Sequence, residues 1–214
     1  MGCDPGGFLS ELEIDAFQEL MNIVFGSAAA DLAEVIDMHV VLSVPMLKMT
    51  RASELPAFIS QNIEDGSARS TLVEQTFLGR FSGVALIVFP HDDENKFITL
   101  FRENEAMYAD FGSPMDLEKE ILLEVGNILI GACVSKLAAM LKESVIYEPP
   151  AIAFKDTIKT GFYNRLLKPD NCAIVLRTSF RFEADDISCY FFLVTSESSL
   201  IWLKKAINDY LNQF

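Results

Sequence analysis

A carboxylate and a carboxamide recur together at two places in the sequence, each time within an apolar stretch rich in small residues. Glu19 and Asn22 lie in ELMNIVFGSAAADLAEV, and Glu124 and Asn127 lie in EVGNILIGACVSKLAAM. A carboxylate accepts hydrogen bonds and attracts cations, whereas a carboxamide donates and accepts at once. Such a pair can position a polar group without supplying a nucleophile itself.

Helical periodicity puts each pair on a polar stripe. At about 100° per residue, spacings of three and four positions return to one face of a helix. The first stripe contains Asp15, Glu19, Asn22 and Gly26, and the second contains Glu120, Glu124, Asn127 and Gly131. The opposite, apolar faces contain Phe17, Leu20, Met21, Val24, Ala28 and Val35 in the first helix, and Leu122, Val125, Leu129, Cys133 and Met140 in the second. The polar and core sides are therefore expected to be separate.

Small side chains follow both stripes. They are Ala29, Ala30 and Ala33 in the first copy, and Val134, Ser135 and Ala138 in the second. A solvated helix face usually carries Lys, Glu and Arg, so this composition indicates a surface open to close approach by another protein. The plain alternative is that exposed Glu and Asn are merely solvated. Against it, asparagine lowers helix propensity, and neither packing nor capping explains one in the middle of each helix.

The two stretches belong to a repeat that extends over most of the chain. Asn127 lies 105 positions after Asn22, and the same offset relates Pro45 to Pro150 and, further on, Phe77 to Phe182. We therefore predict a single domain over 1–214, made of two internal repeats at about 10–105 and 114–210.

Each half is expected to begin with a long helix, at about 10–37 and 114–143. Ser10 and Glu13 match a capping box, and Pro114 suits the first helical position. A strand with a proline follows in each half, then a pair of strands rich in Phe, Val, Ile and Thr, and then a shorter helix. The segment 101–114 joins the halves. The predicted fold class is α/β (α+β), with pseudo-twofold duplicated units, an approximately six-stranded sheet and two long antiparallel helices.

Composition excludes several classes of function. The formal net charge is −14, from 31 acidic and 17 basic residues, which disfavours binding to nucleic acid. No signal segment is recognised, and no apolar run approaches the roughly 20 residues that span a bilayer, so we expect a cytoplasmic protein without membrane contact. The four cysteines form no CxxC and are expected to be free thiols, although Cys172 and Cys189 could face each other across a hairpin. With only two histidines, a metal site formed by this chain alone is not expected.

At the two Glu and Asn pairs, the sequence resembles the CheC, CheX and FliY phosphatases of chemotaxis. The motif of that family is Asp or Ser, three residues, Glu, two residues, Asn, then twenty-two residues and Pro. Asp15, Glu19, Asn22 and Pro45 fit it fully. Glu124, Asn127 and Pro150 fit it again, with Glu120 in place of Asp or Ser. Two copies favour CheC, because CheX typically retains one and FliY adds a flagellar-switch segment.

The resemblance implies hydrolysis of the aspartyl phosphate of the response regulator CheY. Asn22 and Asn127 would position the attacking water, and Glu19 and Glu124 would pair with a lysine of the regulator. The regulator would supply the acyl phosphate and Mg²⁺, so this chain needs neither a metal ligand nor a nucleophile.

Other functions stay open at this stage. Related flagellar switch proteins are interaction modules without the Glu and Asn pairs, and CheC-like proteins can also act as partners of the receptor deamidase CheD. An ordinary metabolic enzyme is disfavoured, because the sequence has no glycine-rich phosphate loop, nucleophile motif or dinucleotide fingerprint.

Overall fold

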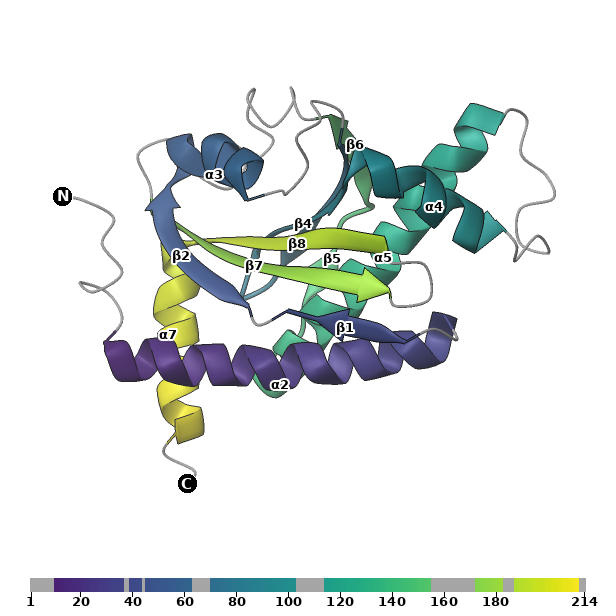
Figure 1. The fold of residues 1–214 in the computed structure, drawn as a ribbon. Helices are drawn as coiled ribbons and strands as arrows, with labels where there is room; N and C mark the ends of the chain where they lie inside the picture. Colours follow the sequence, from purple (N-terminus) through teal and green to yellow (C-terminus); the bar gives the residue numbers. More distant parts are fainter. Residues whose placement is uncertain are drawn as a thin grey trace.

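Two long helices and one sheet dominate the structure, a computed structural model that describes residues 10–36, 39–43, 45–62, 70–102, 114–154, 172–182 and 187–211. The helices are α2 (Glu11–Ile36), the 3-10 turn η1 (Ala52–Glu54), α3 (Leu55–Gln61), α4 (His91–Arg102), α5 (Pro114–Met140) and α7 (Glu197–Leu211). The strands are β1 (Val40–Leu42), β2 (Met46–Arg51), β3 (Thr71–Leu78), β4 (Gly83–Phe89), β5 (Ile146–Tyr147), β6 (Ala151–Phe154), β7 (Cys172–Phe182) and β8 (Ile187–Ser196). Helices and antiparallel strands therefore combine in an α+β fold, as predicted (Figure 1).

Eight strand segments occupy six positions in the sheet. The order is β1-β7-β8-β4-β3-β5, with β2 also pairing with β7 and β6 also pairing with β3. Each outer position is thus one strand in two pieces, and all the pairs are antiparallel. Strands from both halves of the chain share this one sheet.

Both outer strands are interrupted at the predicted prolines. Leu42 pairs with Phe180 and Met46 with Arg177, so the spacing between paired residues is four positions on this strand but three on β7. In the other half, 148–150 stand opposite two residues of β3, because Tyr147 pairs with Phe77 and Ala151 with Glu74. Each interruption is a bulge of one extra residue, which suits proline because proline cannot donate to the ladder.

The strand register corrects one part of the predicted repeat. Leu42 and Tyr147 are 105 positions apart, but their partners Phe180 and Phe77 are 103 apart. The gapless offset that matched Phe77 to Phe182 is therefore wrong in the strands: by register, Phe180 is the counterpart of Phe77. Loop lengths differ between the halves, and a sequence offset carried across the loops cannot detect that change.

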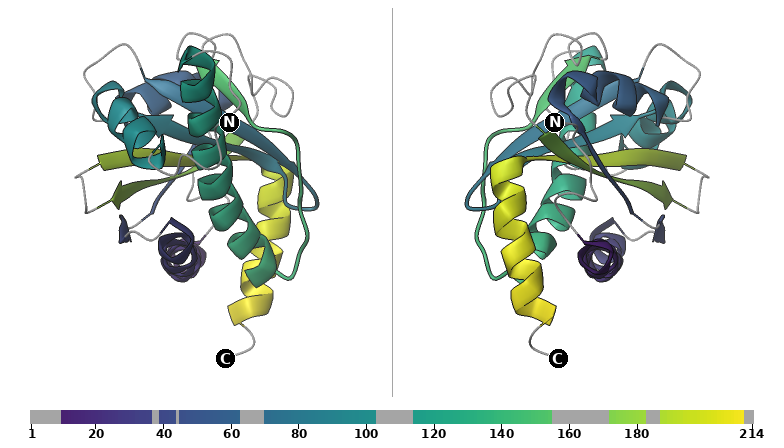
Figure 2. Two further views of the ribbon diagram at one scale, coloured as in Figure 1. Left: turned by 90° about the vertical axis from the view of Figure 1, so that its right-hand side faces the viewer. Right: turned by 90° about the vertical axis from the view of Figure 1, so that its left-hand side faces the viewer.

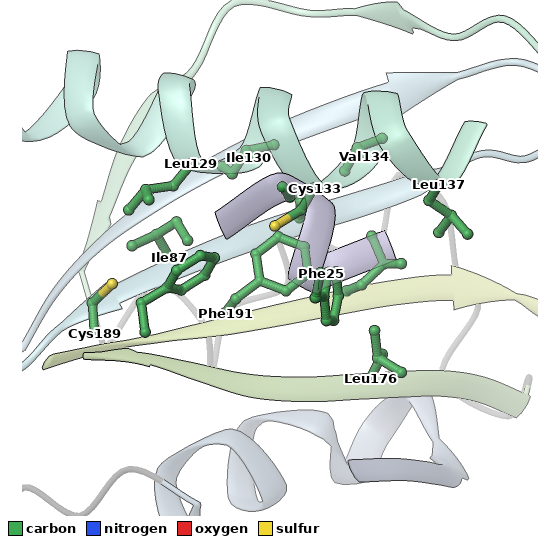
Figure 3. Packing of buried hydrophobic residues seen from close by; sticks show 14 of the residues in the cluster. Phe25, Ile87, Leu129, Ile130, Cys133, Val134, Leu137, Leu176, Cys189 and Phe191 are labelled. Atoms are coloured by element: carbon green, nitrogen blue, oxygen red, sulfur yellow. The ribbon is translucent and has the colours of Figure 1, made fainter. Parts of the chain in front are cut away.

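The main core lies between one face of the sheet and the long helices. The predicted apolar faces of α2 and α5 pack there, with Phe25, Leu129, Cys133 and Phe191 among the residues drawn in Figure 3. Met140 is only partly buried, and the side chain of Val35 lies outside the described set. The two helices run in opposite senses and cross obliquely, as Figures 1 and 2 show.

A second, smaller core covers the other face of the sheet. Leu55, Phe58 and Ile59 of α3 pack there against Val84, Leu86 and Val88 of β4 and against β7 and β8. The sequence prediction missed η1 and α3. A helix of only seven residues is too short to show a clear helical period.

Within the described residues, α5 is the one helix long and apolar enough to cross a membrane, at Leu117–Met140 with a mean hydropathy of 1.7. However, 56% of its most apolar stretch is buried, and it packs on α2, β3 and β4. This is the pattern of a core helix.

Two cysteines are buried free thiols, Cys133 and Cys189. The alternative disulfide across the β7–β8 hairpin is wrong, because Cys189 is a free thiol that pairs with Phe180, whereas Cys172 pairs with Arg51 of β2.

Candidate functional site

The first polar stripe lies on the surface of α2. Asp15, Glu19, Asn22 and Gly26 are all exposed, whereas the neighbouring Leu20 and Met21 are buried. The predicted separation of polar and core sides is therefore correct on this helix. Ile23 beside the stripe is 46% exposed, so the surface combines acids, a carboxamide and an apolar side chain.

A groove of about 490 Å³ runs between this stripe and the edge of the sheet. The helix contributes Asn22, Phe25, Gly26, Ala29, Ala30 and Ala33, and the facing wall contributes residues 39–43 and Pro45. The asparagine, the small residues and the distant proline thus come together in one place. Ala29 is only 8% exposed, however, so the prediction that it lies on the cleared face is wrong. The contribution of His39 was not predicted from the sequence, where histidines were considered only as metal ligands.

Gly26 lies at an open point of this surface. A Cβ added there would meet no atom within 4 Å, and the same holds for Gly131. By contrast, a Cβ at Gly126 would lie 2.6 Å from the Val73 side chain. Packing within the chain therefore requires glycine at 126 but not at 26 or 131. An exposed helical glycine costs about 0.5–1 kcal/mol relative to alanine, so the chain carries this cost without internal benefit.

Hydrogen bonds fix the sheet wall of the groove. Ser43 and Ser179 form two hydrogen bonds: Ser43 N donates to the backbone carbonyl of Ser179, and Ser179 N donates to the side-chain Oγ of Ser43, both at 2.9 Å. Thr178 Oγ1 donates to Ser43 O at 2.7 Å. The bulge before Pro45, which is itself buried, is thereby held against β7.

The second stripe differs from the first in burial. Glu120 is exposed, but Glu124, Asn127 and Gly131 are only partly exposed. Asn127 Oδ1 accepts a hydrogen bond from Gln75 Nε2 at 3.1 Å, and Gln75 comes from β3, 52 positions away in sequence. Pro150 follows the bulge at the matching edge and is partly buried.

Beyond Asn127, the second helix departs from the expectation of an open surface. Val134 and Ala138 are 0% and 3% exposed, so the prediction that they lie on a cleared face is wrong. Ser135 is exposed, and its Oγ lies 2.9 Å from the Tyr147 hydroxyl. Burial raises the pKa of Tyr147, which keeps that hydroxyl protonated near neutral pH. The counterparts at the first site are Ala30 and Leu42, which cannot form this bond.

No group of three or more His, Cys, Asp or Glu side chains that could hold a metal ion occurs in the part of the chain that the structure describes. The geometry at the first stripe is instead that of a surface groove with one carboxamide on its wall and a carboxylate one helical turn away.

The fold is shared with three solved structures. The crystal structure of Thermotoga maritima FliY has a TM-score of 0.68 at 19% identity, covering 96% of this chain and 98% of that one. The FliM middle domain from Vibrio alginolyticus has a TM-score of 0.59 at 14% identity, covering 88% and 98%. CheX from Desulfovibrio desulfuricans has a TM-score of 0.52 at 10% identity, covering 83% and 99%. The fold of this chain is therefore the one found in FliY, the FliM middle domain and CheX.

Two comparisons of the amino-acid sequence also find similar proteins. The model of the CheC-like family matches residues 12–49, which contain Glu19, Asn22 and Pro45. The flagellar motor switch phosphatase FliY of Bacillus subtilis is 23% identical over 180 residues, covering 84% of this chain and 44% of that protein. The chain thus spans less than half the length of that relative. The sequence is therefore similar to the family of CheC, CheX and FliY. The preference for CheC within this family stays a prediction.

Proposed function

We propose that the protein is a phosphatase that hydrolyses the aspartyl phosphate of a CheY-type response regulator. The observation that carries this proposal is the groove at α2. Two residues of the family motif line it: Asn22 on the helix and Pro45 on the facing wall. A relative in Bacillus subtilis is named a phosphatase, and its name motivates the proposed reaction.

In the proposed mechanism, the regulator docks over the exposed stripe of α2. This helix contains six acidic residues and no Lys or Arg, so its surface complements a cationic patch and not a phosphate. Glu19 would pair with a lysine of the regulator, and Glu124 would do the same at the second site. Asp15 and Glu120 begin the two stripes and would extend the contact.

Asn22 would act on the attacking water. An exposed carboxamide can accept a hydrogen bond from water and donate one to a phosphoryl oxygen. Holding the water in line with the scissile P–O bond lowers the entropic cost of bringing it into the geometry of attack. Phosphoryl transfer needs mainly positioning and electrostatic stabilisation, so no base on this chain is required. Asn127 would have the same role at the second site.

Mg²⁺ enters this proposal as a ligand of the regulator, where it would neutralise charge on the phosphoryl group. Gly26 and Gly131 would allow the regulator's backbone to approach the helices closely. We also propose that the protein works in the cytoplasm and forms one domain of two repeats.

The test measures decay of the aspartyl phosphate on a cognate CheY. Wild type is expected to accelerate the decay, each of Asn22→Ala and Asn127→Ala to reduce it, and the double variant to abolish it. Asn95→Ala is the matched control, because Asn95 is an exposed helical asparagine away from both stripes. The thermal unfolding temperature should not fall in the Asn22→Ala variant, because alanine has a higher helix propensity than asparagine at this exposed position.

Decay unaffected by wild-type protein would contradict the proposal and favour a non-catalytic interaction module. A module of that kind is compatible with the fold, since the FliM middle domain shares it. A pull-down with CheD would separately test whether the protein acts as a regulator of receptor deamidation.

A further inference from the structure

A buried polar side chain of the central sheet stands opposite each proline bulge. By register, Thr178 on β7 is the counterpart of Gln75 on β3, since both lie within the two residues that face a bulge. Thr178 Oγ1 donates to the carbonyl of Ser43 at 2.7 Å, and Gln75 Nε2 donates to the carbonyl of Glu148 at 3.1 Å. In both halves, therefore, a buried side chain of the neighbouring strand donates a hydrogen bond to a backbone carbonyl of the bulge.

Gln75 also donates a hydrogen bond to a site residue, which Thr178 does not. Its Nε2 donates a second hydrogen bond, to Asn127 Oδ1 at 3.1 Å. A backbone carbonyl can only accept, so the bond to Glu148 requires that the amide nitrogen of Gln75 face this side. The atom that Asn127 presents to that nitrogen must then be its oxygen. The network therefore fixes which way round the Asn127 carboxamide lies and directs its Nδ2 away from Gln75.

At the first site, Thr178 cannot impose an equivalent constraint on Asn22. A threonine hydroxyl has a single proton, and that of Thr178 is already donated to Ser43. The terminal torsion of an asparagine side chain is otherwise broad, so the exposed Asn22 carboxamide can rotate between its two orientations.

Stability alone does not explain glutamine at position 75. The side chain is 4% exposed, and in the described part of the chain its Oε1 is buried without a hydrogen-bond partner. An unpaired buried acceptor is unfavourable, so an apolar side chain of the same shape would satisfy the sheet better. Donation to Asn127 is the contribution that such a side chain could not make.

We infer that Gln75 is a positioning residue of the second site, which presents Asn127 already oriented, whereas Asn22 becomes oriented only when a partner docks. The inference rests on the proposed function for its effect on rate, but not for the orientation itself.

The kinetic test uses Gln75→Met, which keeps the shape of the side chain but removes its donor. In the Asn22→Ala background, where only the second site is intact, we expect the rate at saturating regulator to fall about 10- to 100-fold. The half-saturating concentration should stay within about twofold, because Gln75 is only 4% exposed and so presents little surface for docking. In the Asn127→Ala background the same substitution should leave the rate within about twofold. Equal losses in the two backgrounds, or no loss in the first, would overturn the inference.

Thr178→Val is the matched control. It removes the corresponding bond to the first bulge and leaves both carboxamides untouched, so it separates support of a bulge from orientation of an asparagine. A loss at the first site as large as that caused by Gln75→Met at the second would contradict a specific role for Gln75.

A second readout does not depend on activity. The order parameters of the side-chain amides, measured by ¹⁵N relaxation, should be higher for Asn127 than for Asn22 in wild type. In Gln75→Met the Asn127 value should fall to that of Asn22. If wild type failed to accelerate phosphate decay, the proposed function would fail, while this measurement would still decide whether Gln75 orients Asn127. Equal mobility of the two amides in wild type would overturn the inference.

Discussion

The Glu13 carboxylate joins the first turn of α2 to α7 through Asn208. Asn208 Nδ2 donates to Glu13 Oε1 at 2.9 Å, and Lys204 Nζ lies 3.1 Å from Oε2. The same carboxylate accepts the backbone N–H of Ser10 at 2.8 Å, and Ser10 Oγ accepts the backbone N–H of Glu13 at 3.3 Å. The predicted capping box is therefore confirmed, and it also anchors the helix that carries the first site to the end of the chain.

This relationship predicts a stability that depends on pH. Hydrogen bonds, first that from the Ser10 backbone, lower the pKa of Glu13 from 4.5 to about 2. Because the pKa is lower in the folded chain, the carboxylate stabilises the fold above pH 4.5, and this contribution is lost as the pH falls toward 2. Glu13→Gln should lower the free energy of unfolding by about 1.5–3 kcal/mol at neutral pH. Urea unfolding measured across this pH range should show that the difference in unfolding free energy between wild type and Glu13→Gln decreases as the pH falls. Glu11→Gln, in the same turn but exposed, is the control, and a difference that does not depend on pH would contradict the prediction.

Gly26→Ala should separate stability from docking. Alanine meets no atom there, so the variant should be more stable by about 0.5–1 kcal/mol because of helix propensity. Its added methyl group should nevertheless weaken binding of the regulator, which is measured by titration calorimetry. Gly126→Ala should instead destabilise the protein by about 1–3 kcal/mol, because its Cβ would overlap Val73. Unchanged affinity in Gly26→Ala would show that the partner does not approach this point of the helix.

Charge reversal at Glu19 should weaken docking in a way that depends on salt. Glu19→Lys removes the proposed pairing with the regulator's lysine and places two cations together, so the dissociation constant should rise about tenfold or more at low salt. The effect should decrease as ionic strength rises and screens the charges. Glu118→Lys makes the same change of charge at an exposed position outside both stripes. Similar losses in the two variants would indicate a general effect of net charge.

The buried thiols should be unreactive in the folded protein. Burial raises the pKa of Cys133 and of Cys189, so neither forms the reactive thiolate near neutral pH. In a Cys3→Ser, Cys172→Ser variant, a thiol reagent should label no site within minutes in buffer and two sites in denaturant. Rapid labelling in buffer would mean that the core around α5 opens easily.

Local patterns were sufficient to predict much of the fold. The capping residues and Pro114 predicted where α2 and α5 begin, and the apolar period predicted buried faces at Phe17 and Val125. Runs rich in Phe, Val, Ile and Thr were sufficient for the strand pairs, because each pair is a hairpin of neighbouring segments.

Contacts between distant segments could not be predicted in this way. The bond from Gln75 to Asn127 depends on the register of β3 with β5 and β6, which no local pattern specifies. The burial of Val134 likewise results from packing that a helical projection does not contain. The groove was predicted only in part: Asn22 and Pro45 were identified by motif, whereas His39 and Val41 became visible only with the fold.

The bulges at Pro45 and Pro150 affect more than the two stripes. An uninterrupted outer strand exposes a continuous row of backbone donors and acceptors, which can pair with the same edge of another molecule. Here each outer strand is short, kinked and divided near a proline, so neither edge offers a long template for such pairing. Both edges of the sheet are thereby protected against polymerisation, and at the first edge Pro45 also lines the groove.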